Sequence, residues 1–132
     1  MAGYSPKSLA DKLGIKPGMA LHAIAAPKDY RALLGIDATF AAKSPKGGAD
    51  FVHLFVTSLA ELDKQLPLAR KAMKPDGMLW VSWYKKAAKI PTDVTEDTIR
   101  ARALKTDLVD VKVCAVSEVW SGLKLMVRKH LR

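Results

Sequence analysis

The sequence contains a single cysteine, Cys114, so an internal disulfide is excluded. It also lacks any run of about 18 apolar residues, the length that a membrane-spanning helix requires. The first residues, Met-Ala-Gly-Tyr-Ser, show no basic stretch followed by an apolar core, which a secretory signal would have. A chain with one cysteine and no internal disulfide suits a reducing compartment. We therefore expect a cytoplasmic protein.

The motifs of several enzyme classes are missing as well. There is no Gly-x-Ser-x-Gly nucleophile elbow and no Gly-x-x-x-x-Gly-Lys phosphate loop. The three histidines and the cysteine do not have the spacing of metal ligands. The sequence thus predicts no catalytic residue and no metal site, and it favours a binding role over an enzymatic one.

The composition is that of a globular, basic chain. Of the 132 residues 49% are apolar, which is enough to bury a core, and we expect one domain over residues 1–132. The formal net charge of +9 favours anionic partners such as a nucleotide, an acidic protein or a nucleic acid. The lysines are scattered along the chain, so nucleic-acid binding is an alternative and not the first interpretation.

Hydrophobic patterning predicts an α/β fold. Residues 50–57 and 77–84 are apolar on both faces, which is typical of strands in the middle of a layered sheet. Residues 19–25 form a third buried strand, and 36–42 a shorter one. Residues 108–113 and 123–128 alternate in polarity and predict an antiparallel hairpin. The predicted helices cover residues 5–13, 28–34, 58–73 and 95–105, and Pro67 is expected to break or kink the third.

The right-handed crossover rule then limits the topology to a doubly wound, three-layer Rossmann-like sheet. The predicted strand order is 36–42, 19–25, 50–57, 77–84, 123–128 and 108–113, with 123–128 antiparallel to the others. The connection 43–49 is short for a parallel crossover, because its residues reach about 23 Å when fully extended. We therefore expect the strand over 36–42 to be short, displaced or differently oriented.

Two resemblances support this fold. Residues 69–79, Ala-Arg-Lys-Ala-Met-Lys-Pro-Asp-Gly-Met-Leu, resemble the helix-to-strand turn of class I S-adenosylmethionine-dependent methyltransferases, and so do Lys16-Pro17-Gly18 and the terminal hairpin. The whole chain also resembles a family of small bacterial proteins known as a domain of unknown function. The residues that carry this second resemblance are Gly3-Tyr4-Ser5, Leu9, 12–16, 55–58, 110–116 and 120–125. It implies a methyltransferase-like fold and no established activity.

The sequence departs from the methyltransferase pattern where that family binds its cofactor. The resemblance implies a glycine-rich loop after the strand 19–25, but no glycine lies between Gly18 and Gly35. It also implies a carboxylate at the end of the next strand, where this chain has Ala41, Ala42 and Lys43. These departures argue against S-adenosylmethionine, and the cofactor stays unknown. A methyltransferase with a degenerate cofactor loop remains the alternative.

Ligands of open α/β sheets bind outside the carboxyl ends of the strands. Ser58 also begins a helix whose amides face this edge and could bind an anion. One interpretation of this edge is a site for an anionic, partly aromatic ligand. The alternative, which the sequence favours, is that the lysines are solvated and the tryptophans belong to the core. The candidate ligand-binding residues are Lys28, Lys43, Thr57, Ser58, Trp83, Tyr84, Lys85, Lys86 and Trp120.

Two further features of the sequence have competing interpretations. His22 and His53 lie on strands that are predicted neighbours, so they could approach each other as a proton-relaying or ligating pair, or be ordinary core residues. Cys114 is expected to be an inert, buried thiol.

Overall fold

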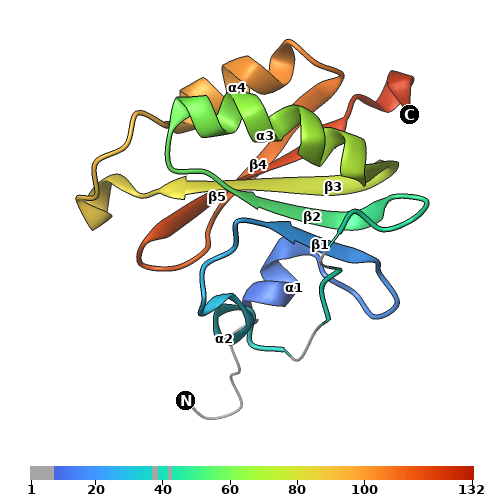
Figure 1. Cartoon of the computed structure of the whole chain (residues 1–132), viewed down its shortest axis with the longest axis horizontal. Coiled ribbons are helices and arrows are strands. Elements are labelled where there is room, and N and C mark those ends of the chain that lie inside the picture. The colour runs from blue at the N-terminus through green and yellow to red at the C-terminus, as the bar shows by residue number, and fades with distance from the viewer. Residues whose placement is uncertain (1–7, 37–38, 42) are drawn as a thin grey trace.

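The computed structural model describes residues 8–36, 39–41 and 43–132. Its core is a five-stranded sheet in the order β1-β2-β3-β5-β4 (Figure 1). The strands are β1 (Leu21–Ile24), β2 (Ala49–Phe55), β3 (Met73–Tyr84), β4 (Leu108–Ala115) and β5 (Trp120–Val127). β1, β2 and β3 are parallel, and β5 is antiparallel to both β3 and β4. The mixed α/β sheet and the terminal hairpin thus agree with the prediction.

The helices are α1 (Leu9–Leu13), α2 (Tyr30–Leu34), α3 (Leu59–Ala72) and α4 (Glu96–Leu104). Single turns of 3₁₀ helix follow at Lys86–Ala88 and Lys129–Leu131. Ser8 caps α1 through its Oγ, which accepts a hydrogen bond from the Asp11 amide at 3.1 Å. The predicted start of this helix at Ser5 and Pro6 lies outside the described residues, as does the motif at residues 3–5.

Helices cover the sheet on both sides. α3 and α4 pack on one face, where Leu62 and Ile99 contact the core around Leu79. α1 and α2 pack on the other face, against Phe51 and Trp80. The side chains of β2 and β3 are consequently buried on both faces, which is the physical reason for their nearly continuous apolar sequences.

The strand predicted over 36–42 is not found among the described residues of that segment. Residues 37, 38 and 42 lie outside the description, and Ala41 makes only one parallel bridge, to His22 of β1. The seven residues before β2 are too few for a full parallel crossover, so the chain follows β1 for one residue and then turns to β2.

The helix α3 runs without interruption through Pro67, so of the predicted break or kink, the break does not occur. A proline removes one backbone hydrogen bond and leaves a carbonyl on the preceding turn without its partner. Pro67 and Asp63, whose carbonyl loses that partner, are both exposed. Water can therefore solvate this carbonyl, and the helix continues.

Candidate functional site

The turn after β1 occupies the position where the sequence departs from the methyltransferase pattern. Ala25 has φ 60°, in the left-handed region that favours glycine, and its side chain is exposed. Ala26 and Pro27 follow it. The chain thus makes a tight turn of the glycine type at the carboxyl end of β1, but with a methyl group on the turn residue and proline close behind.

At the N-terminus of α3, where an anion site was predicted, three amides already donate to the chain's own oxygen atoms. Ser58 Oγ accepts a hydrogen bond from the Glu61 amide at 3.1 Å. The Glu61 carboxylate accepts one from the Thr57 amide at 3.2 Å, and Asp93 Oδ1 accepts one from the Leu59 amide at 2.8 Å. A ligand at this helix end would have to displace these carboxylates.

The aromatic candidates at the same edge belong to the core. Trp83 is 7% exposed and Trp120 is 8% exposed. Tyr84 stacks on Trp120 with ring centroids 4.5 Å apart. The third tryptophan, Trp80, is fully buried and donates a hydrogen bond from Nε1 to the Leu13 carbonyl at 2.9 Å. This packing corresponds to the alternative in which the tryptophans stabilise the fold.

The lysine candidates remain at the surface. Lys28, Lys43 and Lys86 are exposed, and Lys85 is partly buried beside the terminal hairpin. The Lys85 amide donates a hydrogen bond to the Val119 carbonyl at 2.8 Å, which fixes the start of this loop. The structure thus brings Tyr84 and Trp120 together and leaves the charged side chains of the edge in contact with solvent.

His22 and His53 do not form a pair, and both are buried, which agrees with the interpretation of ordinary core residues. In the register of β1 and β2, His22 lies opposite Val52 and His53 lies opposite Ala23. Side chains alternate along a strand, so the two imidazoles project to opposite faces of the sheet. Adjacency of the strands could be inferred from the sequence, whereas this one-residue difference in register could not.

His53 instead belongs to a buried chain of hydrogen bonds that the sequence analysis missed. Its Nδ1 is 2.7 Å from the Tyr30 hydroxyl, and its Nε2 is 2.7 Å from Ser82 Oγ. Burial lowers the pKa of His53 to about 3 and raises the pKa of Tyr30. The only signal in the sequence is a polar residue within each of two apolar strands.

The Ser82–His53 hydrogen bond has the geometry of an activated nucleophile, but both side chains have no solvent exposure. A substrate could not reach Ser82 without opening the core.

The remaining reactive groups in the described part of the chain do not form a site. Cys114 is half-buried and its thiol lies 3.3 Å from the Ala115 carbonyl. Within the described residues, no group of three or more His, Cys, Asp or Glu side chains could hold a metal ion.

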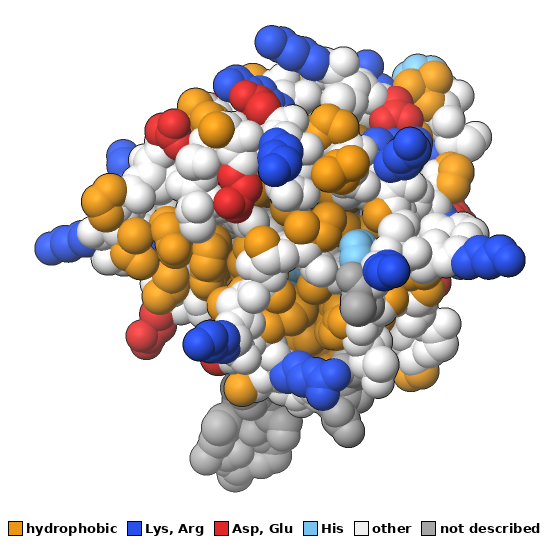
Figure 2. Space-filling model, viewed as in Figure 1, with side chains coloured by type: hydrophobic (Ala, Val, Ile, Leu, Met, Phe, Trp, Pro, Cys, Tyr) orange, Lys and Arg blue, Asp and Glu red, His pale blue; other side chains and the backbone are white. Residues whose placement is uncertain are grey.

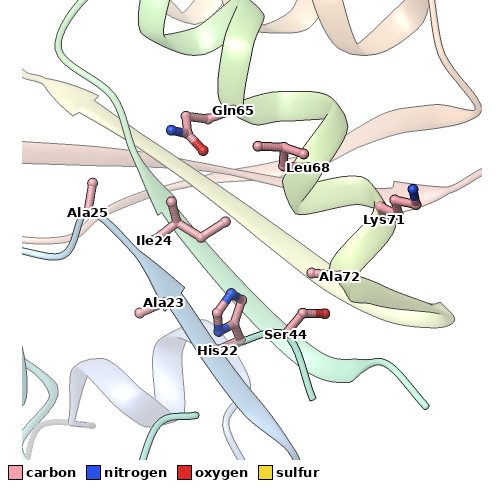
Figure 3. A pocket seen from close by; sticks show the side chains of 9 residues that line it. All are labelled: His22, Ala23, Ile24, Ala25, Ser44, Gln65, Leu68, Lys71 and Ala72. Carbon is pink, nitrogen blue, oxygen red and sulfur yellow. The ribbon is translucent and has the colours of Figure 1, made fainter. Parts of the chain in front are cut away.

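An open groove of about 500 Å³ lies between β1 and α3. Figure 2 shows apolar side chains gathered in a hollow on this face, with Lys and Arg side chains around it. In Figure 3, Leu68 and Gln65 project from α3 toward Ile24, and His22 projects from β1 beside Ser44. None of the candidate residues of the carboxyl edge lines this groove.

Solved structures of methyltransferases are similar to this chain. The ribosomal protein L11 methylase of Lactobacillus delbrueckii subsp. bulgaricus superposes with a TM-score of 0.59 over 90% of this chain and 74% of its own, at 12% identity. The tRNA methyltransferase TrmK of B. subtilis gives a TM-score of 0.59 over 94% of this chain and 67% of its own, at 13% identity. The chain has a methyltransferase-like fold.

At this level of identity the likeness shows the fold and not the activity. No protein-family model matches the sequence, and no curated protein matches it either. The resemblance to the bacterial domain of unknown function therefore stays a prediction. None of the described helices is long and apolar enough to cross a membrane.

Proposed function

We propose that this chain is a non-catalytic binding module on a methyltransferase-like scaffold, which takes an anionic ligand at the carboxyl edge of the sheet. The observation that carries the proposal is the turn after β1. A close backbone approach to a nucleoside needs glycines there, and this chain has Ala25, Ala26 and Pro27. With a methyl group on Ala25 and a proline ring close behind, the turn is not open in the way that a glycine-rich cofactor loop is.

The ligand would contact lysine side chains and not helix amides. The Leu59 and Glu61 amides of α3 already donate to the chain's own oxygen atoms, whereas Lys28, Lys43 and Lys86 are exposed. Together with the net charge of +9, this arrangement supports an anionic group such as a phosphate or an acidic protein segment. Binding of this kind weakens steeply as the salt concentration rises.

The alternative is an S-adenosylmethionine-dependent methyltransferase with a degenerate cofactor loop. It is supported by the names of the two similar structures, both of which are methylating enzymes. One of them is named as a tRNA methyltransferase, so an oligonucleotide belongs among the ligands that should be tested.

Isothermal titration calorimetry with ATP, a short single-stranded oligonucleotide and S-adenosylmethionine tests the proposal, each at low and moderate salt. We expect the ATP or the oligonucleotide to bind at low salt and the double variant Lys85→Gln/Lys86→Gln to lose affinity. The matched control is Lys105→Gln/Lys129→Gln, which removes the same charge at the opposite edge of the sheet and should bind like the wild type.

Three outcomes contradict the proposal. The first is that neither polyanion binds even in dilute buffer. The second is that both double variants lose affinity equally, since this would reflect net charge and not a site. The third is tight, salt-independent binding of S-adenosylmethionine, which would favour the methyltransferase alternative.

A further inference from the structure

The groove between β1 and α3 has an apolar floor that no other element covers among the described residues. Ile24 of β1 and Leu68 and Ala72 of α3 line it, and Leu68 is 53% exposed. The volume of about 500 Å³ lies within the range of small-molecule sites. A leucine exposed to this extent beside other apolar side chains marks a surface that a ligand could cover at a gain in free energy.

His22 provides a polar group that is aimed into this groove. Its side chain is 7% exposed, and its Nδ1 lies 2.9 Å from the Ala41 carbonyl. A carbonyl oxygen can only accept, so Nδ1 must carry the hydrogen and Nε2 of the neutral ring has a lone pair. No hydrogen bond from a described residue reaches Nε2. The ring is nearly buried, and Nε2 is the atom that reaches the groove, where it can accept a hydrogen bond from a donor on a ligand.

The charge around the groove indicates that such a ligand also carries an anionic group. Lys71, Gln65 and Ser44 complete the polar lining, and no acidic side chain is among the lining residues. An ammonium group without a nearby carboxylate attracts an anion, and the apolar floor strengthens this attraction by excluding water on one side.

We infer that this groove binds a small organic acid. Its apolar body lies over Ile24 and Leu68, its acid group pairs with Lys71, and an N–H or O–H group donates to Nε2 of His22. The inference goes beyond the proposed function, because the groove lies on the α3 face of β1. It shares Ala25 of the turn with the carboxyl edge, but none of the candidate ligand-binding lysines lines it. Each site can therefore fail without the other.

Fluorescence titration with anilinonaphthalenesulfonate tests this inference, because the probe combines apolar rings, one N–H donor and a sulfonate. We expect Lys71→Gln, Leu68→Ser and His22→Asn each to weaken binding about tenfold, the loss of about 1.4 kcal/mol. The asparagine keeps a donor for the Ala41 carbonyl and removes only the acceptor in the groove. Lys64→Gln, also on α3 but outside the groove, is the matched control and should bind like the wild type.

The variants of Lys71 and Leu68 change exposed side chains, so the test holds even if His22→Asn is poorly folded. Amide resonances of residues 23–25 and 65–72 should shift on titration. Equal binding by phenylnaphthylamine, which lacks the sulfonate, would overturn the inference. Unchanged affinity in both Lys71→Gln and Leu68→Ser would also overturn it. A third contrary result is amide shifts confined to a different cavity, which is lined by Ala10, Met19 and Ile36.

Discussion

At the scale of single residues, the turn at Ala25 differs from the glycine-rich loop that the resemblance to methyltransferases implies. A left-handed φ at a residue with a Cβ costs about 1 kcal/mol or more. The residue is nevertheless alanine, so this turn combines a left-handed φ with a methyl group on its surface.

Ala25→Gly should leave the stability unchanged or raise it by up to about 1 kcal/mol, because relief of the strained φ opposes the greater flexibility of the unfolded chain. Ala26→Gly is the control, since Ala26 does not have a positive φ, and it should cost about 0.5–1 kcal/mol. Urea unfolding of both variants measures the difference. If Ala25→Gly is the less stable of the two, the backbone strain is not relieved by glycine.

At the scale of elements, β3 connects α3 directly to the centre of the sheet. Met73 pairs with Ala49, and the regular pairing then resumes at Met78 with Phe51, so the segment between them is an irregularity of the ladder. Gly77 lies at this point. A Cβ on Gly77 would meet the Ala49 carbonyl oxygen at 2.8 Å and the Lys74 carbonyl oxygen at 3.1 Å. The close backbone contact at this point therefore requires glycine at position 77.

We expect Gly77→Ala to destabilise the protein by about 2 kcal/mol or more, because the clash is with backbone atoms that cannot rotate away. Asp76→Ala, at the exposed neighbouring position, should change the stability by less than about 0.5 kcal/mol. Thermal unfolding monitored by circular dichroism compares the two. Equal melting temperatures for both variants would show that β3 can shift to accommodate the methyl group.

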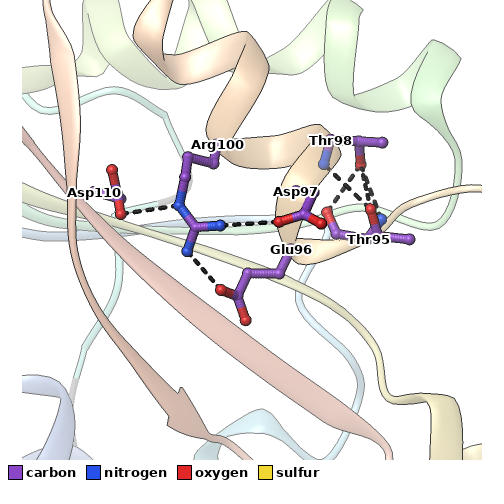
Figure 4. Close-up of polar contacts among 6 residues, drawn as sticks. All are labelled: Thr95, Glu96, Asp97, Thr98, Arg100 and Asp110. Carbon is purple, nitrogen blue, oxygen red and sulfur yellow. Dashed lines mark hydrogen bonds and ion pairs between the residues drawn. The ribbon is translucent and has the colours of Figure 1, made fainter.

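At the scale of the whole molecule, ion pairs attach the helices to the sheet. Arg70 of α3 bonds to Asp107 before β4, and Arg100 of α4 bonds to Asp110 of β4 and to Glu96 and Asp97 of its own helix (Figure 4). Hydrogen bonds from these arginines lower the pKa of Asp107 and Asp110 below the ordinary value. The stability that these carboxylates contribute is present above their unfolded pKa and is lost as the pH falls through the lowered folded values.

His53 makes the stability depend on pH in a second, higher pH range. Its folded pKa of about 3 lies below the ordinary value of 6.5, so between these values the unfolded state binds a proton that the folded state does not. Stability should therefore fall as the pH drops from about 6.5, with a limiting slope on the order of 1.4 kcal/mol per pH unit.

His53→Gln should flatten this slope between about pH 6.5 and 5, even though the variant is less stable. His130→Gln, at an exposed position near the C-terminus, is the control and should keep it. Urea unfolding at several pH values gives the slopes. An unchanged slope in His53→Gln would show that the buried imidazole does not control this dependence.

The sequence by itself determined which segments are buried on both faces and which alternate. Apolar residues at every position of 51–56 except His53, and at most positions of 78–84, require cover on both sides, and the Ser58 cap marks the start of α3. It also showed that no glycine lies between Gly18 and Gly35, since that is a matter of residue identity alone.

Only the tertiary structure decided which side chains meet. The register of β1 against β2 separates His22 from His53 and turns His22 toward α3. The pairing of β2 with β3 and the packing of α2 bring His53 between Tyr30 and Ser82. A shift of one residue would exchange these faces while leaving every local pattern intact. The groove likewise depends on how far α3 lies from β1, and that distance is set by packing across the sheet, which no local stretch of sequence encodes.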